Sequence, residues 1–209
     1  MIELSFESGE PTFVAFMPAP IANREADEAA QFSVGALDTR WKLPPHAAHL
    51  AVAMPVSGHG SPMDRLSRFT SLLAAIVQAT PAVGVYWGDA GATHGRDFFL
   101  SVAKDRSIVP RLMLWTGVSI TAEDEARISY LSLGMSQLDF PDLLLVARKS
   151  RASSALEMVF DLLVYVAKRG EPLPEGDTVG RTADERLPVH YVPSPLGKDV
   201  LVWRVELHD

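Results

Sequence analysis

The segment Phe140–Gly180 constrains the fold of this chain more than any other part of the sequence. It contains a short, fully apolar run, Leu143–Ala147, with the length and composition of a buried strand. A long apolar stretch follows, in which Ser154 and Glu157 have the spacing of a capping box. We therefore expect a long, mostly buried helix that begins near Ser154. It should end at Gly170, because glycine readily adopts the left-handed conformation that terminates helices.

A second long helix is predicted between Pro62 and Thr80. Ser61 can cap it, Pro62 suits the first helical position, and Asp64 suits the positive end of the helix dipole. Apolar residues then repeat at helical spacing until Thr80 and Pro81 end the pattern.

Shorter elements surround these two helices. Apolar or β-rich runs predict strands at Thr12–Met17, His49–Val56, Val83–Trp87, Arg111–Ile120, Arg127–Gln137, Leu143–Ala147, Val189–Val192 and Val200–Leu207. We expect residues 49–56 to be a buried strand, and 111–120 and 127–137 to form an antiparallel pair. Asn23–Gln31, with Asn23 as a possible cap, predicts a surface helix; Arg96–Ala103 predicts another, and Gly88–Gly95 predicts a loop.

This order of elements predicts an α+β fold in a single domain. We expect a mixed, mostly antiparallel sheet with the two long helices packed on it. The order strand, helix, strand occurs twice, which indicates an internal duplication with halves 1–108 and 109–209. Helices packed on one face of a mixed sheet would produce the same order.

Composition limits the function classes. The net charge of -7 argues against nucleic-acid binding, which needs clustered Lys and Arg side chains. The absence of cysteine excludes disulfides, thiolate zinc sites and cysteine nucleophiles. The acidic N-terminal segment lacks the features of a signal peptide, and no apolar run reaches membrane-spanning length. We expect a cytoplasmic protein without a membrane partner.

The loop that follows Val83–Trp87 is the best candidate for a binding site. Its glycines let a ligand approach the backbone, and it offers two carboxylates and an imidazole for metal binding or acid–base chemistry. The candidate residues are Trp87, Asp89, His94, Arg96 and Asp97, with His59 converging from a neighbouring strand end. The alternative is structural: the glycines serve turns, and the polar side chains cap local backbone.

Specific catalytic motifs are absent. The glycines at 88, 91 and 95 match neither dinucleotide-binding nor phosphate-binding loops, and Ser61 lacks the glycine that a nucleophile elbow requires two places later. Glu157 and Asp161 share one narrow stripe of the long helix, which favours a solvated edge over a catalytic pair. The sequence therefore assigns no catalytic residue and no cofactor.

Four segments carry a family resemblance: VGVYWGDAGATHGRDFF, MLWTGVSI, LSLGMSQLDFPDLLLVA and LVYVAKRGEPLPEGDTVG. Through them, from about Ala48 to Leu207, the chain resembles the bacterial domain-of-unknown-function family numbered 4261. This resemblance implies a family and no activity. The run Asp161–Val166 and the Gly-Asp-Thr-Val turn after it are also similar in layout to the suppressor-of-fused-like domain. That superfamily includes bacterial immunity proteins that bind and neutralise toxins.

These observations lead to two expectations. The first is a non-enzymatic protein-binding module of an immunity or regulatory type, with a basic protein or toxin as its partner, because complementary charge speeds association. The second is a metal-assisted hydrolase that uses the Trp87–Asp97 loop.

Overall fold

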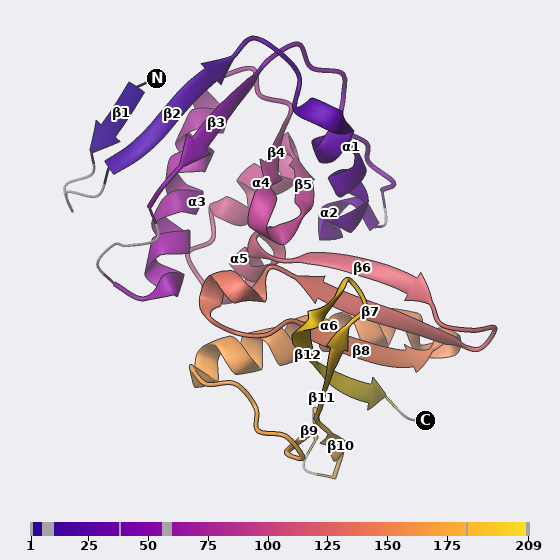
Figure 1. Cartoon of the computed structure of the whole chain (residues 1–209). Helices are drawn as coiled ribbons and strands as arrows, with labels where there is room; N and C mark the ends of the chain where they lie inside the picture. The colour runs from indigo at the N-terminus through magenta and orange to yellow at the C-terminus, as the bar shows by residue number, and fades with distance from the viewer. Residues whose placement is uncertain (1, 6–10, 38, 56–59, 183, 208–209) are drawn as a thin grey trace. The chain divides into compact units, whose positions relative to one another are not determined.

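The computed structural model describes residues 2–5, 11–37, 39–55, 60–182 and 184–207 (Figure 1). It divides into two compact units, each of which is considered by itself. The first comprises Met1–Gly88 and Ala92–Arg106, and the second comprises Asp89–Gly91 and Ser107–Asp209. Helices and mixed sheets occur together, which confirms the α+β class. The single-domain organisation and the duplication stay predictions.

The first unit contains an antiparallel sheet of order β1-β2-β3, a two-stranded hairpin and four α-helices (Figure 1). Its strands are β1 (Ile2–Ser5), β2 (Pro11–Met17), β3 (His49–Ala53), β4 (Gly84–Trp87) and β5 (Ala92–Gly95). Its helices are α1 (Glu25–Ala29), α2 (Val34–Leu37), α3 (Pro62–Ala79) and α4 (Arg96–Ala103), with 3-10 turns at Ala22–Arg24 and Ala30–Phe32.

The capping residues of α3 act as the sequence predicts. The Ser61 hydroxyl accepts a bond from the Asp64 amide at 3.2 Å, and the Asp64 carboxylate accepts one from the Ser61 amide at 3.2 Å. Because both bonds satisfy amides at the start of the helix, this is a complete capping box. Thr80 is extended and ends the helix.

Three local predictions in the first unit are wrong. β3 is a strand, but Leu50, Ala51 and Ala53 are exposed, because its sheet leaves part of this strand uncovered. Asn23 does not cap a helix; its φ of 54° places it inside a 3-10 turn, and α1 begins at Glu25. Gly88–Gly95 is not only a loop, since its second half is strand β5, paired with β4.

The second unit is built on a five-stranded sheet of order β11-β12-β8-β7-β6. Its strands are β6 (Gly117–Ala122), β7 (Arg127–Leu133), β8 (Leu143–Arg148), β11 (His190–Ser194) and β12 (Gly197–Leu207). A small ribbon pairs β9 (Thr178–Val179) with β10 (Leu187–Pro188), and the helices are α5 (Ile108–Trp115) and α6 (Ala152–Arg169). Short 3-10 turns lie at Met135–Leu138 and Lys149–Arg151, and a third, Gly88–Ala90, begins at the last residue of the first unit's first segment. β8 and β12 run parallel, and the other neighbours are antiparallel.

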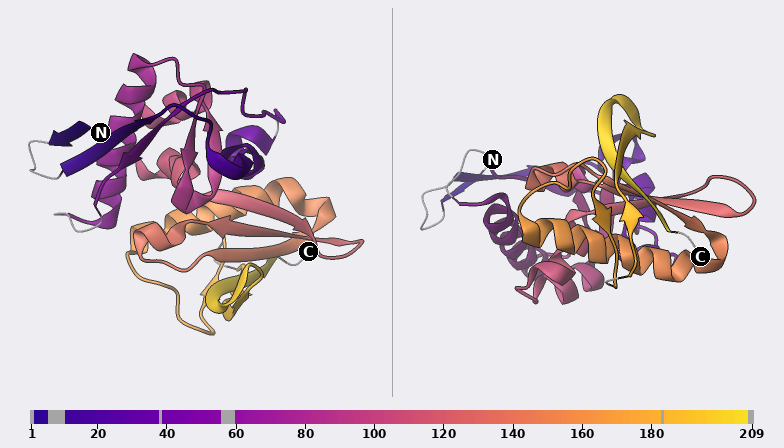
Figure 2. Two further views of the ribbon diagram at one scale, coloured as in Figure 1. Left: turned by 45° about the horizontal axis from the view of Figure 1, so that its top comes forward. Right: turned by 90° about the horizontal axis from the view of Figure 1, so that it is seen from below.

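Strand β8 is the centre of this sheet and is buried on both faces. Leu144 and Val146 pack with Leu131 and Val202 on one face. On the other face lies Leu145, whose cross-strand partner Tyr130 donates a hydrogen bond to the Ala152 carbonyl at 2.9 Å. Ala152 begins α6, so α6 covers this second face, as the views in Figure 2 also show.

Helix α6 confirms the predicted length and end, but not the predicted start. Gly170 has φ 77° and follows the last helical residue, as expected. The helix begins at Ala152, and Ser154 donates to the Arg151 carbonyl at 3.0 Å rather than capping. Glu157 and Asp161 are exposed, in line with a solvated stripe.

The predicted strand Arg111–Ile120 is wrong over its first half. Ile108–Trp115 forms helix α5, which packs on α6 with Leu112, Leu114 and Trp115 buried. Only the part from Gly117 is a strand, and it pairs with β7 as predicted. A short run made almost entirely of apolar residues is compatible with a buried helix or a buried strand. Packing against α6 favours the helix for this segment. The two long helices also belong to different units: α3 lies in the first, and α6 lies in the second, where it packs on β8 and β7 of the five-stranded sheet.

The Asp142 carboxyl joins the strands at one end of this sheet. Its Oδ1 accepts bonds from the Ser132 hydroxyl at 2.9 Å and the Met135 amide at 3.1 Å. The Ser132 hydroxyl in turn accepts the Leu143 amide at 2.8 Å, and the Asp142 carbonyl accepts the Trp203 amide at 3.0 Å. Burial raises the pKa of Asp142, although the bonds from Met135, Ser132 and the Gly134 amide oppose this rise.

Replacing Asp142 should therefore destabilise the protein. We expect Asp142→Ala to lower the free energy of unfolding by about 1–3 kcal/mol, because partly buried donors lose their acceptor. Asp142→Asn should cost less, since its side-chain oxygen still accepts. Urea denaturation measures both. The exposed Asp161→Ala is the control and should lie within about 0.5 kcal/mol of the parent.

The pH dependence of these variants follows from the raised pKa. A carboxyl with a raised pKa in the folded state binds its proton more tightly there than in the unfolded chain. Its stabilising contribution is complete below 3.8, the ordinary pKa of an aspartate, and is lost as pH rises through the higher pKa of the folded state. The stability of the parent relative to Asp142→Asn should thus increase from pH 7 to pH 4. A difference that is flat or of the opposite sign would contradict the assignment.

Candidate functional site

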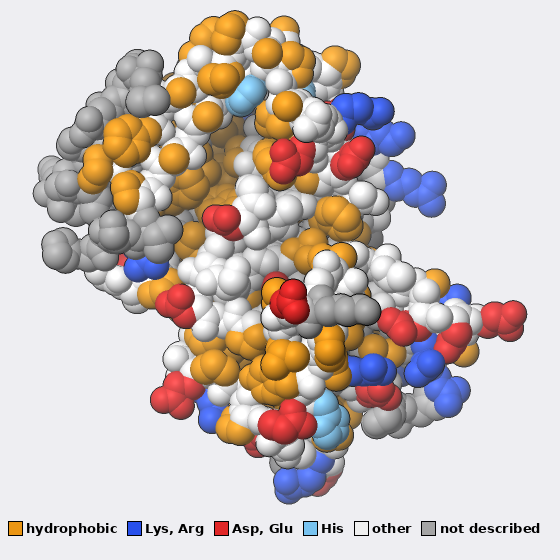
Figure 3. Space-filling view, in the orientation of Figure 1, with side chains coloured by type: hydrophobic (Ala, Val, Ile, Leu, Met, Phe, Trp, Pro, Cys, Tyr) orange, Lys and Arg blue, Asp and Glu red, His pale blue; other side chains and the backbone are white. Residues whose placement is uncertain are grey.

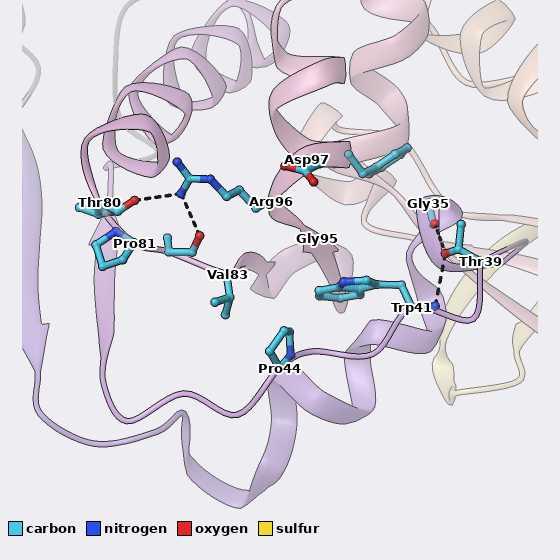
Figure 4. Close-up of a pocket in the computed structure, with 12 residues that line it drawn as sticks. Gly35, Thr39, Trp41, Pro44, Thr80, Pro81, Val83, Gly95, Arg96 and Asp97 are labelled. Atoms are coloured by element: carbon cyan, nitrogen blue, oxygen red, sulfur yellow. Dashed lines mark hydrogen bonds between the residues drawn. The ribbon is translucent and has the colours of Figure 1, made fainter.

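A surface pocket of about 530 Å³ lies within the first unit (Figure 4). Three segments form it: α2 with the chain after it, the chain between α3 and β4, and the end of β5 with the start of α4. The lining residues are Gly35, Thr39, Trp41, Pro44, Thr80, Pro81, Ala82, Val83, Gly95, Arg96, Asp97 and Phe98. Its volume lies in the range of about 300–1,000 Å³ that is typical of small-molecule sites.

The Trp41 indole forms one wall and depends on a pair of glycines. Gly84 and Gly95 are directly opposite each other in the β4–β5 hairpin. A Cβ on Gly95 would lie 2.9 Å from the indole, and one on Gly84 would lie 2.7 Å from the His94 carbonyl and 3.4 Å from the indole. The missing side chains therefore let the half-buried ring lie against the hairpin backbone.

The backbone around Trp41 is fixed by Thr39. The Thr39 hydroxyl donates to the Gly35 carbonyl at 2.9 Å and accepts the Trp41 amide at 3.3 Å (Figure 4). The Phe98 ring lies over Gly35, where a Cβ would come within 2.5 Å of it. These contacts tie the chain after α2 to the start of α4.

Arg96 holds the opposite wall. Its Nη1 donates to the carbonyl oxygens of Thr80 and Ala82, each at 2.9 Å (Figure 4). Its own amide donates to the Val83 carbonyl at 3.1 Å. The guanidinium thus fixes the segment between α3 and β4 with one of its two terminal nitrogens.

Two of the residues predicted from the sequence, Arg96 and Asp97, lie together at this pocket. Asp97 is exposed in the first turn of α4. The other predicted residues do not line the pocket. Trp87 is buried, and its ring packs edge-on against Phe69 at 5.5 Å.

His94 is completely buried in β5. Its Nδ1 lies 2.8 Å from the Ser33 hydroxyl, which is also buried, and its ring packs against Phe98 at 5.8 Å. A buried histidine paired in this way stabilises the packing of the hairpin on the preceding turn. It has no path to a solvent-borne substrate in this conformation.

The remaining candidates lie elsewhere. Asp89 is exposed and belongs to the second unit. His59 lies outside the residues that the structure describes. Among the described residues, no three His, Asp or Glu side chains are grouped so that they could hold a metal ion.

Sequence reasoning missed the aromatic part of the pocket. Trp41 lies outside the predicted helices and strands, and nothing in its neighbours indicates where the ring packs. The sequence signal for this packing is the pair of glycines, Gly84 and Gly95, which leaves room for a ring. The two glycines can be recognised as a pair only when the pairing of β4 with β5 is known. Arg96 and Asp97 were found because they follow a strand and a glycine-containing segment.

Residues 131–206 match the model of a domain of unknown function, DUF4261. The match confirms the family resemblance over this segment, which covers β7 onward in the second unit and does not include the pocket. It does not extend to the earlier segments that carried the resemblance.

The other comparisons add no relative. No significant match was found among curated proteins or solved structures, and the similarity to a suppressor-of-fused-like domain is not shown. None of the helices in the described part of the chain has the length and apolar character needed to cross a membrane.

The contact between Gly95 and Trp41 can be tested with a double-mutant cycle. Gly95→Ala should lower the free energy of unfolding by about 1–3 kcal/mol, because its Cβ would overlap the indole. The three atoms nearest to that Cβ all belong to Trp41, so the penalty should largely disappear in a Trp41→Ala background. Urea denaturation of the four proteins gives the coupling energy.

Gly88→Ala is the matched control for this cycle. No atom lies within 4 Å of the Cβ it would add, so its effect should stay within about 0.5 kcal/mol. If Gly95→Ala cost the same with and without the indole, the packing described for Trp41 would be incorrect.

Proposed function

We propose that this protein is a non-enzymatic protein-binding module of an immunity or regulatory type. The observation that carries the proposal is an exposed apolar surface at the tip of the β11–β12 hairpin. Leu196, Val200 and Leu201 are 71%, 59% and 53% exposed. We call these three residues, with the exposed Pro193 and Pro195, the hairpin tip.

The hairpin tip differs from scattered surface apolar residues. Single exposed leucines are normal, whereas several exposed apolar side chains on one projecting element favour an interaction surface. Figure 2 shows the hairpin projecting from its sheet, and Figure 3 shows hydrophobic side chains gathered over it. The hairpin also lies inside the segment matched by the family model.

The hairpin is poorly suited to bind a partner by adding a further strand to its edge. β11 is an edge strand that contains Pro193, and its register with β12 shifts between Pro193 and Ser194. A proline and an irregular register both disfavour the addition of a further strand. Side-chain contact with a partner is therefore the better explanation of the tip.

The negative charge of the chain favours a partner with a basic surface. The net charge of -7 favours a basic protein, because complementary potentials accelerate association and exclude acidic competitors. Asp199 is exposed within the same hairpin. The partner surface should combine an apolar patch with a basic rim, which is also the charge expected of a toxin that an acidic immunity protein neutralises.

The hydrolase alternative has no comparable support. His94, its most specific candidate group, is buried and paired with Ser33, and Asp89 belongs to the other unit. No described observation favours a bound metal.

The proposal is tested by affinity capture from the source cells at low salt. The parent protein should retain a basic partner in near-stoichiometric amount, and the double variant Leu196→Ser, Leu201→Ser should lose it. The interaction should weaken as salt is raised, because exposed charges are screened.

Ile120→Ser is the matched control, since Ile120 is 40% exposed on β6 of the same sheet. It should capture the partner as the parent does. Near-equal urea midpoints would show that all three proteins are folded. Capture that is unaffected by the tip variant, or lost equally in the control, would refute the hairpin tip as the binding surface.

A further inference from the structure

We infer that two copies of this chain form a symmetric dimer in which β3 of one copy pairs antiparallel with β3 of the other. This interface lies in the first unit and is independent of the hairpin tip, which lies in the second. β3 is an edge of the sheet β1-β2-β3 (Figure 1). Its backbone pairs with β2, and within the described residues it forms hydrogen bonds with no other segment. The outer edge of β3 is therefore a template for a further strand.

β3 lacks the features that protect other edge strands from such pairing. Proline, charged side chains and an irregular register all disfavour an added strand. β11 has Pro193 and a shifted register, and β6 runs directly into the acidic turn at Glu123–Glu125. β3 contains neither proline nor any Asp, Glu, Lys or Arg, and its register with β2 is regular over all 5 residues. It is the least protected of these three edges.

Two-fold symmetry fixes the register of the added strand. Around such an axis, each side chain must lie opposite one on the same face of the sheet. The register that pairs every residue of β3 places Ala51 on the axis, opposite Ala51 of the second copy. Leu50 then lies opposite Val52 of the second copy, and His49 lies opposite Ala53. The residue on the axis is small and exposed, so the two backbones can approach.

This register joins the apolar side chains of the two sheets into continuous rows. Leu50 is already paired with Phe16 of β2, and Val52 is paired with Val14. In the dimer, Phe16 and Leu50 of one copy would therefore lie in line with Val52 and Val14 of the other. Phe16 is 66% exposed and Leu50 is 38% exposed in the single chain. Cross-strand contact between the copies would remove part of this apolar surface from water.

The distribution of charge favours a second copy as the occupant of this edge. The chain carries a net charge of -7, yet residues 11–23 and 43–63 contain no Asp, Glu, Lys or Arg. Two acidic copies repel each other least where both surfaces are uncharged, and the centres of interfaces are depleted of charged residues. The edge offers no charge with which to select a basic or an acidic partner. It fits a neutral strand that is apolar on both faces, and β3 itself is such a strand.

Disulfide cross-linking of the full chain tests this register. The chain has no cysteine, so one introduced cysteine can form a disulfide only with a second copy. Opposite Cα atoms in an antiparallel pair are about 4.5–5.5 Å apart, within the disulfide range of about 4.4–6.8 Å. We expect mild oxidation to convert most of the Ala51→Cys protein to a covalent dimer on non-reducing electrophoresis. The matched control is Ala53→Cys, also an exposed alanine of β3. Its two copies would lie about 13 Å or more apart, so it should stay monomeric on the gel.

Sedimentation of the unmodified chain tests the dimer without a cross-link. The parent should show a species of twice the 22.8 kDa chain mass. Ala51→Lys should weaken the dimer about fivefold, because it places like charges directly opposite each other. Higher salt should strengthen the dimer, since screening reduces the repulsion between acidic copies, whereas it should weaken capture of a basic partner. The hairpin-tip variant Leu196→Ser, Leu201→Ser should dimerise as the parent does.

Three outcomes overturn the inference. Equal cross-linking of Ala51→Cys and Ala53→Cys would indicate random collision between copies. A parent that sediments as a monomer even at about 1 mM would show that β3 is not a self-pairing edge. Loss of the dimer in the hairpin-tip variant would place the contact between copies in the second unit. Urea midpoints near that of the parent would show that both cysteine variants are folded.

Discussion

The second unit depends on the burial of one strand on both faces. Every residue from Leu143 to Ala147 is apolar, so β8 is stable only where something covers each side of it. α6 covers one face; on the other, Leu144 and Val146 are buried side by side with Leu131 and Val202 of the two neighbouring strands. The Asp142 carboxyl then sets where this strand begins, because it binds the end of β7 and the turn after it.

The first unit depends instead on aromatic rings that pack directly against the backbone. The indole of Trp41 and the ring of Phe98 lie where glycines leave room, over Gly95 and Gly35. Arg96 ties the neighbouring segment by two bonds from a single nitrogen. Side chains from three separate segments thus come together without any sequence motif that links them, and the pocket is a consequence of that packing.

The fold was predictable where local signals were strong. The capping box at Ser61 and Asp64, the stop at Gly170 and the apolar run of β8 each act within a few residues. Prediction failed where two structures satisfy the same pattern. Ile108–Trp115 is short and apolar, so only its packing on α6 makes it a helix. The strand Ala92–Gly95 was not predicted, because Gly95 is typical of a turn. Its pairing with Gly84 shows that it belongs to a strand.

The sequence by itself determined the α+β class, the two long helices, most strands and the family resemblance over residues 131–206. It also placed Arg96 and Asp97 among the binding candidates. Only the tertiary structure decided that His94 is buried against Ser33, that Trp41 joins the two charged residues, and that Leu196, Val200 and Leu201 stay exposed. The reason is physical: caps and apolar runs are local properties of the chain. Burial depends on which distant segment arrives to cover a side chain.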